Sequence, residues 1–354
     1  DVYKRQLYNG SFNQPNFPLK QPDVLGPVVE KWEDGVRTSG NNNEFEWWYL
    51  DAKLEDGSLF VCYFYKVHFL RDRFFIGMNY SSEEFGEIFK LKYFKKDKVS
   101  FAADSCNVSM GENFFIGNLN EYKIALSPDD FDGFGVDIKL KSRLKPYRPQ
   151  DGIIKAEDDF FAWLAAVPDG DVEMELNING AKNKLKGDGY HDHNWGNTPL
   201  QRLFDGWVWF RGKTANHTII AAELNTSNER GGYDIPILYV ADNENGMIIN
   251  RFGQDGLFTR YADRIEGLYN KKNEPYFSKF NLLTKNGDNV IISGKDVIDN
   301  SNLFKRMGLP WPIRIVMHQA KIDPYYTRFN SDLRYEFKGT VENGYGVLEV
   351  MDLK

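Results

Sequence analysis

Tight-turn dipeptides recur along this chain at the short spacing that separates strands in an antiparallel β protein. The Asn-Gly pairs are Asn179-Gly180, Asn245-Gly246, Asn286-Gly287 and Asn343-Gly344, and the Asp-Gly pairs are Asp34-Gly35, Asp56-Gly57, Asp132-Gly133, Asp151-Gly152, Asp169-Gly170, Asp188-Gly189, Asp205-Gly206 and Asp255-Gly256. Such pairs favour positive φ and hence the two-residue turns of hairpins. The sequence therefore predicts many hairpins.

The segments between these turns have the composition of β-strands. Runs rich in aromatic and β-branched residues include 59–69, 171–178, 207–210, 235–240 and 313–317. No apolar stripe at helical spacing persists beyond a few turns, and no low-complexity linker interrupts the pattern. The predicted fold class is all-β, an architecture of barrels or sandwiches.

The length predicts two domains. A chain of 354 residues exceeds what one hydrophobic core usually serves, and its composition, 42% hydrophobic, is enough for two cores. Strand periodicity breaks at residues 197–200, which divide the chain into two parts of barrel size. We therefore expect an N-terminal extension at 1–25, one barrel domain at 26–198 and a second at 199–354.

Charge and cysteine content narrow the classes of partner and compartment. A net charge of -7 argues against a nucleic-acid partner. No run approaches the roughly 18 apolar residues that span a bilayer, and no signal-like segment opens the chain, so we expect a cytoplasmic protein. The alternatives are a membrane-peripheral protein with transient contact to the membrane surface, and a protein that has lost a signal peptide. Cys62 and Cys106 lie in strand-like runs and are predicted to be small buried hydrophobes, with one pairing as the alternative in an oxidising compartment.

One short segment crowds polar and aromatic side chains between glycines. Residues 189–196 read GYHDHNWG. If this segment is extended, alternation places His191, His193 and Trp195 on one face of a strand. Tyr190, Asp192 and Asn194 then lie on the other face.

Three interpretations of this motif stay open. A His-x-His pair can bind one metal ion, but His68, His217 and His318 are scattered and offer no third ligand, and a cysteine-based zinc site is not expected. Alternatively, the polar groups form a hydrogen-bonded plug that closes a barrel end. In the third interpretation they support acid–base chemistry. We expect no metal and, because dinucleotide, phosphate and haem motifs are missing, no cofactor.

The motif and two further segments resemble the carotenoid 1,2-hydratase (hydroxyneurosporene synthase) family, to which fungal lipocalin-like Diels–Alderases are similar. The further segments are EFEWWYLD at 44–51, and 328–329 with 346–349 near the end. The resemblance implies two tandem lipocalin-like β-barrels and a pocket for isoprenoid or polyketide-derived molecules. It implicates His193, Trp195 and an aspartate on a later strand. Here that strand would be 218–225, whose only carboxylate is Glu223, and a tyrosine expected shortly before it is replaced by Ala221 or Ala222.

We therefore predict an apolar pocket at the domain junction in which a carboxylic acid protonates an electron-rich double bond. Burial raises the pKa of such an acid, and a tryptophan face can stabilise the resulting carbocation. The predicted catalytic residues are Glu223 as donor, with Asp192 and His193 in support. The predicted substrate-binding residues are Tyr190, His191, Asn194, Trp195, Trp207, Trp209 and Trp48.

Structural roles compete with these assignments. Asp192 could orient an imidazole or cap a turn. Trp207 and Trp209 alternate onto one face and could be ordinary core residues. Glu44 and Glu46 share a face, where a hydrogen-bonded structural role or a solvated face is expected.

The favoured function is a cofactor-independent hydratase, cyclase or isomerase that acts on a hydrophobic isoprenoid or polyene-like substrate. Its alternatives are a pericyclase that preorganises a linear polyene and a non-catalytic lipid- or terpenoid-binding protein. In all three the partner is a hydrophobic small molecule.

Overall fold

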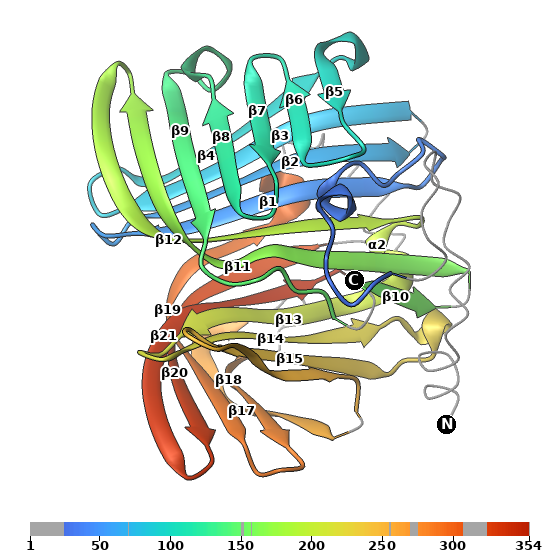
Figure 1. Ribbon diagram of the computed structural model, residues 1–354, viewed down its shortest axis with the longest axis vertical. Coiled ribbons are helices and arrows are strands. Elements are labelled where there is room, and N and C mark those ends of the chain that lie inside the picture. The colour runs from blue at the N-terminus through green and yellow to red at the C-terminus, as the bar shows by residue number, and fades with distance from the viewer. Residues whose placement is uncertain are drawn as a thin grey trace. The chain divides into compact units, whose positions relative to one another are not determined.

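The computed structural model describes residues 25–69, 71–149, 152–156, 158–254, 256–269, 275–306 and 324–353 (Figure 1). Of the predicted N-terminal extension only Leu25 is described, and the predicted strand at 313–317 lies outside the described residues. Strands are the dominant element of the described chain, and its helices contain at most four residues each. The predicted all-β class is confirmed. None of the helices in these ranges is long and apolar enough to span a membrane.

The chain divides after Pro199 into two compact units, each built around one nearly closed antiparallel sheet. The first unit contains η1 (Lys31–Asp34), β1 (Phe45–Leu54), β2 (Leu59–Phe69), β3 (Arg71–Ser82), β4 (Gly86–Phe94), η2 (Lys96–Lys98), β5 (Val99–Phe101), β6 (Asn107–Met110), β7 (Asn113–Gly117), β8 (Glu121–Leu126), η3 (Pro128–Asp130), β9 (Phe134–Ser142), β10 (Ile153–Ala156), β11 (Asp159–Ile178) and β12 (Ala181–Gly196). Its strand order is β4-β3-β2-β1-β12-β11-β9-β8-β7-β6-β5, with β10 paired to β11. The long strands β1, β12 and β11 are therefore central.

The second unit repeats this architecture with fewer strands. It contains α2 (Leu200–Leu203), β13 (Phe204–Lys213), β14 (His217–Thr226), η4 (Asn228–Arg230), β15 (Asp234–Asp242), β16 (Gly246–Phe252), β17 (Leu257–Tyr269), β18 (Pro275–Thr284), β19 (Asn289–Asn302), α3 (Leu303–Arg306), β20 (Tyr325–Phe337) and β21 (Thr340–Asp352). Its strand order is β16-β15-β14-β13-β21-β20-β19-β18-β17. The two tandem lipocalin-like barrels that the family resemblance implied are thus confirmed.

The turn dipeptides predicted many hairpins correctly, but five of them do not form turns. Gly180 and Gly287 have φ of 89° and lie between paired strands, as expected. Asp34-Gly35 instead ends η1, and the pairs at 169–170, 188–189, 205–206 and 343–344 lie inside strands. The reason is close approach of a neighbouring strand: a Cβ on Gly206 would lie 2.3 Å from the Met351 carbonyl oxygen, and one on Gly189 would lie 2.4 Å from the Val172 side chain.

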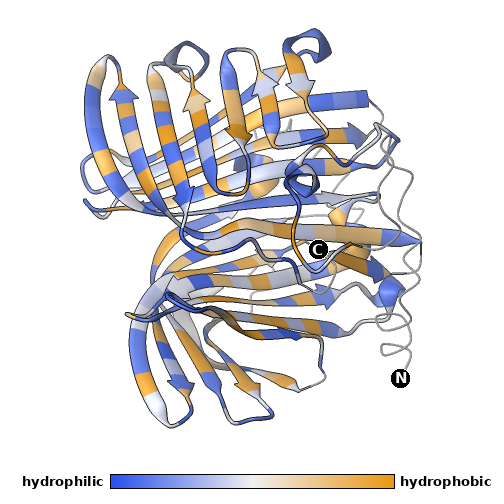
Figure 2. Ribbon diagram, viewed as in Figure 1, coloured by the Kyte–Doolittle hydropathy of each residue, from blue (hydrophilic) through white to orange (hydrophobic). Residues whose placement is uncertain are grey.

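Alternation along the strands gives each unit its own apolar core, and Figure 2 shows hydrophobic and hydrophilic residues alternating along many strands. Phe60, Phe64 and Ile76 are among the buried residues of the first core, and Phe210, Phe280 and Leu348 among those of the second. Cys62 and Cys106 are free thiols in the first core, which confirms the predicted role as buried hydrophobes.

Glu342 in the second unit links stability to pH. Burial acts to raise its pKa, but hydrogen bonds from Asn216, Thr214 and His217 outweigh burial and lower the pKa to about 2. A carboxylate with a depressed pKa stabilises the fold above its unfolded pKa and loses this contribution as pH falls toward the folded pKa.

We therefore expect Glu342→Gln to lower the free energy of unfolding by on the order of 2 kcal/mol at neutral pH. The difference from the wild type should shrink as pH falls from about 5 toward 2. Urea unfolding at several pH values measures it, with the exposed Glu229→Gln as a control that shows no such trend. A difference that stayed constant with pH would contradict the assignment.

Candidate functional site

The GYHDHNWG motif forms the second half of β12, between β1 and β11 at the centre of the first sheet. Trp48 of β1 pairs with His193, and Glu46 pairs with Trp195. His191, His193 and Trp195 lie on the inward face of the sheet, and Tyr190, Asp192 and Asn194 on the outward face. The predicted alternation is confirmed, because the inward residues contact the core while the outward residues bond to one another.

Aromatic rings enclose the inward histidines. The Trp48 and His193 rings are stacked with centroids 4.6 Å apart and planes 11° apart. The Trp195 ring also packs against the His193 ring, and their centroids are 4.7 Å apart. Trp48 is fully buried and Trp195 nearly so, and both belong to the apolar core. Their predicted role in substrate binding therefore has no support from exposure, and packing accounts for both side chains.

The partners of the histidines come from β1 and from residues 25–44, which we call the strap because several of its residues are hydrogen-bonded to strands of the first barrel. His191 Nδ1 lies 2.8 Å from the Tyr49 carbonyl oxygen, and its Nε2 lies 3.2 Å from Asp34 Oδ2. His193 Nδ1 lies 3.2 Å from the Glu33 carbonyl oxygen. The two histidines are therefore hydrogen-bonded, as the plug interpretation requires, to partners that lie far away in the sequence, while closure of a barrel end stays a prediction.

Ion pairs and hydrogen bonds fix the strap elsewhere. Arg148 Nε donates to Glu33 Oε2 at 2.8 Å, and its Nη2 donates to the Gly26 carbonyl oxygen at 2.6 Å. The Tyr122 hydroxyl donates to Asp34 Oδ2 at 2.6 Å. Because Arg148 and Glu33 are both buried, the loss of either partner would leave a charge without compensation.

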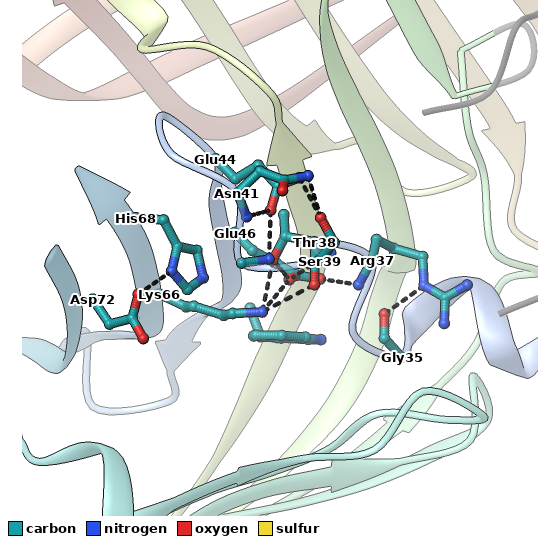
Figure 3. A network of polar contacts seen from close by, with 12 residues as sticks. Gly35, Arg37, Thr38, Ser39, Asn41, Glu44, Glu46, Lys66, His68 and Asp72 are labelled. Atoms are coloured by element: carbon teal, nitrogen blue, oxygen red, sulfur yellow. Dashed lines mark hydrogen bonds and ion pairs between the residues drawn. The ribbon is translucent and has the colours of Figure 1, made fainter. Parts of the chain in front are cut away.

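Glu46 is the centre of the network drawn in Figure 3. Its carboxylate accepts hydrogen bonds from the Arg37 backbone N–H at 2.6 Å, from the Thr38 hydroxyl and from His193 Nε2 at 2.9 Å, and Lys66 Nζ lies 3.6 Å away. Complete burial acts to raise the pKa of Glu46, but the His193 hydrogen bond and the Lys66 charge together lower it. Glu46 is therefore a buried anion.

Glu44 holds the other end of the strap, as Figure 3 also shows. It accepts hydrogen bonds from the backbone N–H groups of Gly40 and Asn41 at 2.7 and 2.9 Å, and from the Ser39 hydroxyl at 2.9 Å. The hydrogen-bonded structural role predicted for Glu44 and Glu46 is confirmed. Neither side chain lies on a solvated face.

The outward face of β12 carries a second buried carboxyl group. Asp192 accepts hydrogen bonds from the Tyr190 hydroxyl at 2.9 Å, Trp163 Nε1 at 3.2 Å and Asn194 Nδ2 at 2.6 Å. Burial raises the pKa of Asp192 to about 7, against the opposing hydrogen bonds. Both structural roles predicted for Asp192, imidazole orientation and turn capping, are wrong, because its partners are a phenol, an indole and an amide. Asp192 and His193 lie on opposite faces of β12.

Glu223 lies on the inward face of the second sheet. Its pairing partner on β13 is Val208, and its side chain is 1% exposed. Its carboxyl group accepts hydrogen bonds from the Tyr261 hydroxyl at 2.6 Å and from the Thr259 hydroxyl. Burial raises the pKa of Glu223, and the two hydroxyls oppose this shift without cancelling it.

Trp207 and Trp209 lie on the opposite face of the second sheet. Both are half-buried, and their neighbours Val208 and Phe210 are the residues that enter the core. The prediction that Glu223 and these two tryptophans face the same pocket is wrong, because β13 pairs with β14 in a register that sets Trp209 opposite Ala222 rather than Glu223. The alternative interpretation as core residues stays a prediction, because both side chains are half-buried and pair with the buried Leu224 and Ala222.

The structure brings together three potential metal ligands that the sequence did not connect. The ligand atoms of Asp34, Cys106 and His191 lie within 4.8 Å of one another, and all three residues are buried. This group includes His191 but not His193, so it supplies no third ligand for the His191–His193 pair, and the expectation of no metal stays a prediction. The sequence analysis had assigned Asp34 to a turn and Cys106 to the core.

Removal of the carboxylate charge should lower the free energy of unfolding more at Glu46, on the inward face, than at Asp192, on the outward face of β12. Glu46→Gln leaves Lys66 buried without its anion, so we expect a loss of about 3–5 kcal/mol in the free energy of unfolding. Asp192→Asn resembles the neutral acid that burial favours, so we expect a loss below about 1.5 kcal/mol at pH 7. Urea unfolding of both variants is the measurement. Equal losses would contradict the distinction between a buried anion and a carboxyl group that titrates near neutrality.

Comparison with known proteins places this geometry in a family context. The model of the family "Carotenoid hydratase CrtC" matches residues 144–234, which include β12 and β14. The quinolone epoxide rearrangement protein asqO of Emericella nidulans is 38% identical over 114 residues, 31% of each chain. Hydroxyneurosporene dehydrogenase of Chlorobaculum tepidum is 24% identical over 206 residues, 47% of this chain and 53% of that protein. The chain thus matches between about a third and a half of these relatives' lengths.

Solved structures share the fold along nearly the whole chain. A putative AttH from Nitrosomonas europaea has a TM-score of 0.64 at 14% identity, covering 95% of this chain and all of that chain. Kievitone hydratase from Nectria haematococca has a TM-score of 0.57 at 12% identity, covering 95% and 98%. CghA with Sch210972 has a TM-score of 0.64 at 10% identity, covering 92% and 96%. The predicted resemblance to the carotenoid hydratase family is confirmed over residues 144–234, and the lipocalin-like fold is shared along nearly the whole chain.

Proposed function

We propose that this protein is a lyase or isomerase that protonates a hydrophobic, isoprenoid or polyene-like substrate without a redox cofactor, with Glu223 as the proton donor. The family model that matches residues 144–234 is one of carotenoid hydratases, and a relative carries the name of an epoxide rearrangement protein, which supports an enzyme of this general kind. The choice of reaction and of Glu223 is our proposal.

The environment of Glu223 carries the proposal. A carboxyl group that is 1% exposed beside Val208 and Ala221 is held in its neutral form more strongly than one in water, because burial disfavours the anion. Burial also raises the pKa of Glu223 toward the pH range in which a general acid works best. Glu46 is equally buried but remains an anion, so it cannot serve as a proton donor.

Two hydroxyl groups prepare Glu223 for the state after proton transfer. When the carboxylic acid gives its proton to an alkene carbon, the π electron pair forms the new C–H bond, a carbocation remains on the substrate and the acid becomes a carboxylate. The Tyr261 and Thr259 hydroxyls already donate to that group and would stabilise the new negative charge. Addition of water or loss of another proton then gives hydration or isomerisation.

Aromatic rings lie close to the same acid. The Tyr261 ring stacks on Phe280 with centroids 5.1 Å apart, and Phe277 lies at 5.2 Å. Aromatic faces attract cations, so rings beside the donor suit a reaction through a carbocation. In this proposal Tyr261 and the rings that contact it have the role that the sequence analysis assigned to Trp207 and Trp209.

We expect Glu223→Gln to lower turnover of an acyclic isoprenoid or polyene alkene by about a hundredfold or more while leaving its binding nearly unchanged. Wild-type activity should fall as pH rises through the raised pKa of Glu223, because only the neutral acid donates. Turnover in deuterium oxide should introduce deuterium at carbon. Mass spectrometry measures product and label, and ligand-induced fluorescence changes measure binding.

Asp192→Asn is the matched control, because it removes the other buried carboxyl group whose pKa is raised. Full activity of Glu223→Gln together with loss of activity in Asp192→Asn would transfer the role of donor to Asp192. Turnover without deuterium incorporation would favour the pericyclase alternative, and tight binding without turnover by the wild type would favour a carrier.

A further inference from the structure

We propose that Asp34, Cys106 and His191 form a structural zinc site inside the first barrel. The site is independent of the proposed function, because Glu223 belongs to the second unit. The ligand atoms of the three residues lie within 4.8 Å of one another. A carboxylate oxygen, a thiolate sulfur and an imidazole nitrogen are all ligands that zinc accepts. The residues are at most 1% exposed, as in the closed sites of structural zinc.

The hydrogen bond of His191 favours a ligating tautomer. Its Nδ1 lies 2.8 Å from the Tyr49 carbonyl oxygen, which can only accept, so Nδ1 carries the proton. In neutral His191 the other nitrogen, Nε2, then presents its lone pair toward Asp34 Oδ2 at 3.2 Å. Two lone pairs in contact need a proton or a cation between them. Metal-binding histidines commonly donate their other N–H to a backbone carbonyl, as His191 does.

Asp34 supplies the second, independent observation. Its Oδ2 accepts a hydrogen bond from the Tyr122 hydroxyl at 2.6 Å, and the Cys106 thiol also interacts with this carboxyl group, but the buried Oδ1 has no well-formed hydrogen bond among the described residues. His193 Nδ1 approaches that oxygen only to 3.6 Å. A buried carboxylate oxygen without a donor is costly, and a cation bound to it removes the cost.

Charge balance also favours a divalent ion. Binding replaces the thiol proton of Cys106 by zinc and releases that proton to solvent, so one thiolate and one carboxylate neutralise the two positive charges. The site would join three segments that are distant in sequence: the strap, the residue before β6 and the centre of β12. Three protein ligands leave a fourth position for the Tyr122 oxygen or a water molecule.

The test uses protein expressed with added zinc and purified without a metal-affinity tag, since a closed core admits the ion most readily during folding. Elemental analysis should find about one equivalent of zinc per chain in the wild type. The matched control is Cys62→Ala, which removes the other buried free thiol of the same core and should keep the zinc. Cys106→Ala should lose it, and so should Cys106→Ser if the alanine variant does not fold.

Two further measurements, a cobalt absorption spectrum and a melting temperature, distinguish zinc bound at this site from adventitious zinc. Protein made with cobalt in place of zinc should show a thiolate-to-cobalt charge-transfer band that persists in Cys62→Ala and disappears in the Cys106 variants. The melting temperature of zinc-loaded wild type should exceed that of protein expressed and purified without zinc by at least about 5 °C. Less than about a tenth of an equivalent in the wild type, or equal zinc in Cys106→Ala, would overturn the proposal and leave a shared proton between Asp34 and His191.

Discussion

The pairing of β12 with β1 is the constraint on which the first unit depends. Because side chains alternate along a strand, this one pairing sends His191 and His193 into the barrel and Asp192 to the other face. A slip by one residue would exchange the two sets and bury the wrong groups in the apolar core. On the other side of β12, Gly189 leaves room for the side chain of Val172 on β11, which would lie 2.4 Å from a Cβ at residue 189.

We interpret the buried charges of the first barrel as groups that select one placement of the strap rather than as groups that add stability. Desolvating Glu46 and Lys66 costs free energy that their attraction repays only with good geometry, so such a pair is weak evidence for added stability. It does, however, penalise every arrangement in which one partner is missing. With the backbone N–H of Arg37 and the hydroxyl of Thr38 also bonded to Glu46, only one placement of the strap satisfies all these groups.

Sequence reasoning recovered the fold because the signals for it are local. Turn dipeptides and strand periodicity act over a few residues, and the run at 59–69 became β2 with the same limits. The Asp-Gly pairs were misassigned where the glycine allows close packing between strands rather than a turn, as at Gly206. The sequence around such a pair does not reveal which strand will pack against it. The partners of the motif were beyond reach for the same reason, since Asp34 and Cys106 meet His191 only in the folded barrel.

The error over Glu223 and the tryptophans has a sharper cause. Within one strand the faces follow from odd and even positions, so Trp207 and Trp209 were correctly placed together. Between two strands of a hairpin the match of faces depends on the turn, and here Lys213 pairs with Thr218, so odd positions of β13 oppose even positions of β14. A change in register by one residue would have set Glu223 opposite a tryptophan. Whether the acid shares a face with the tryptophans is therefore decided by the turn between Lys213 and Thr218, about five residues along β14 from Glu223 itself.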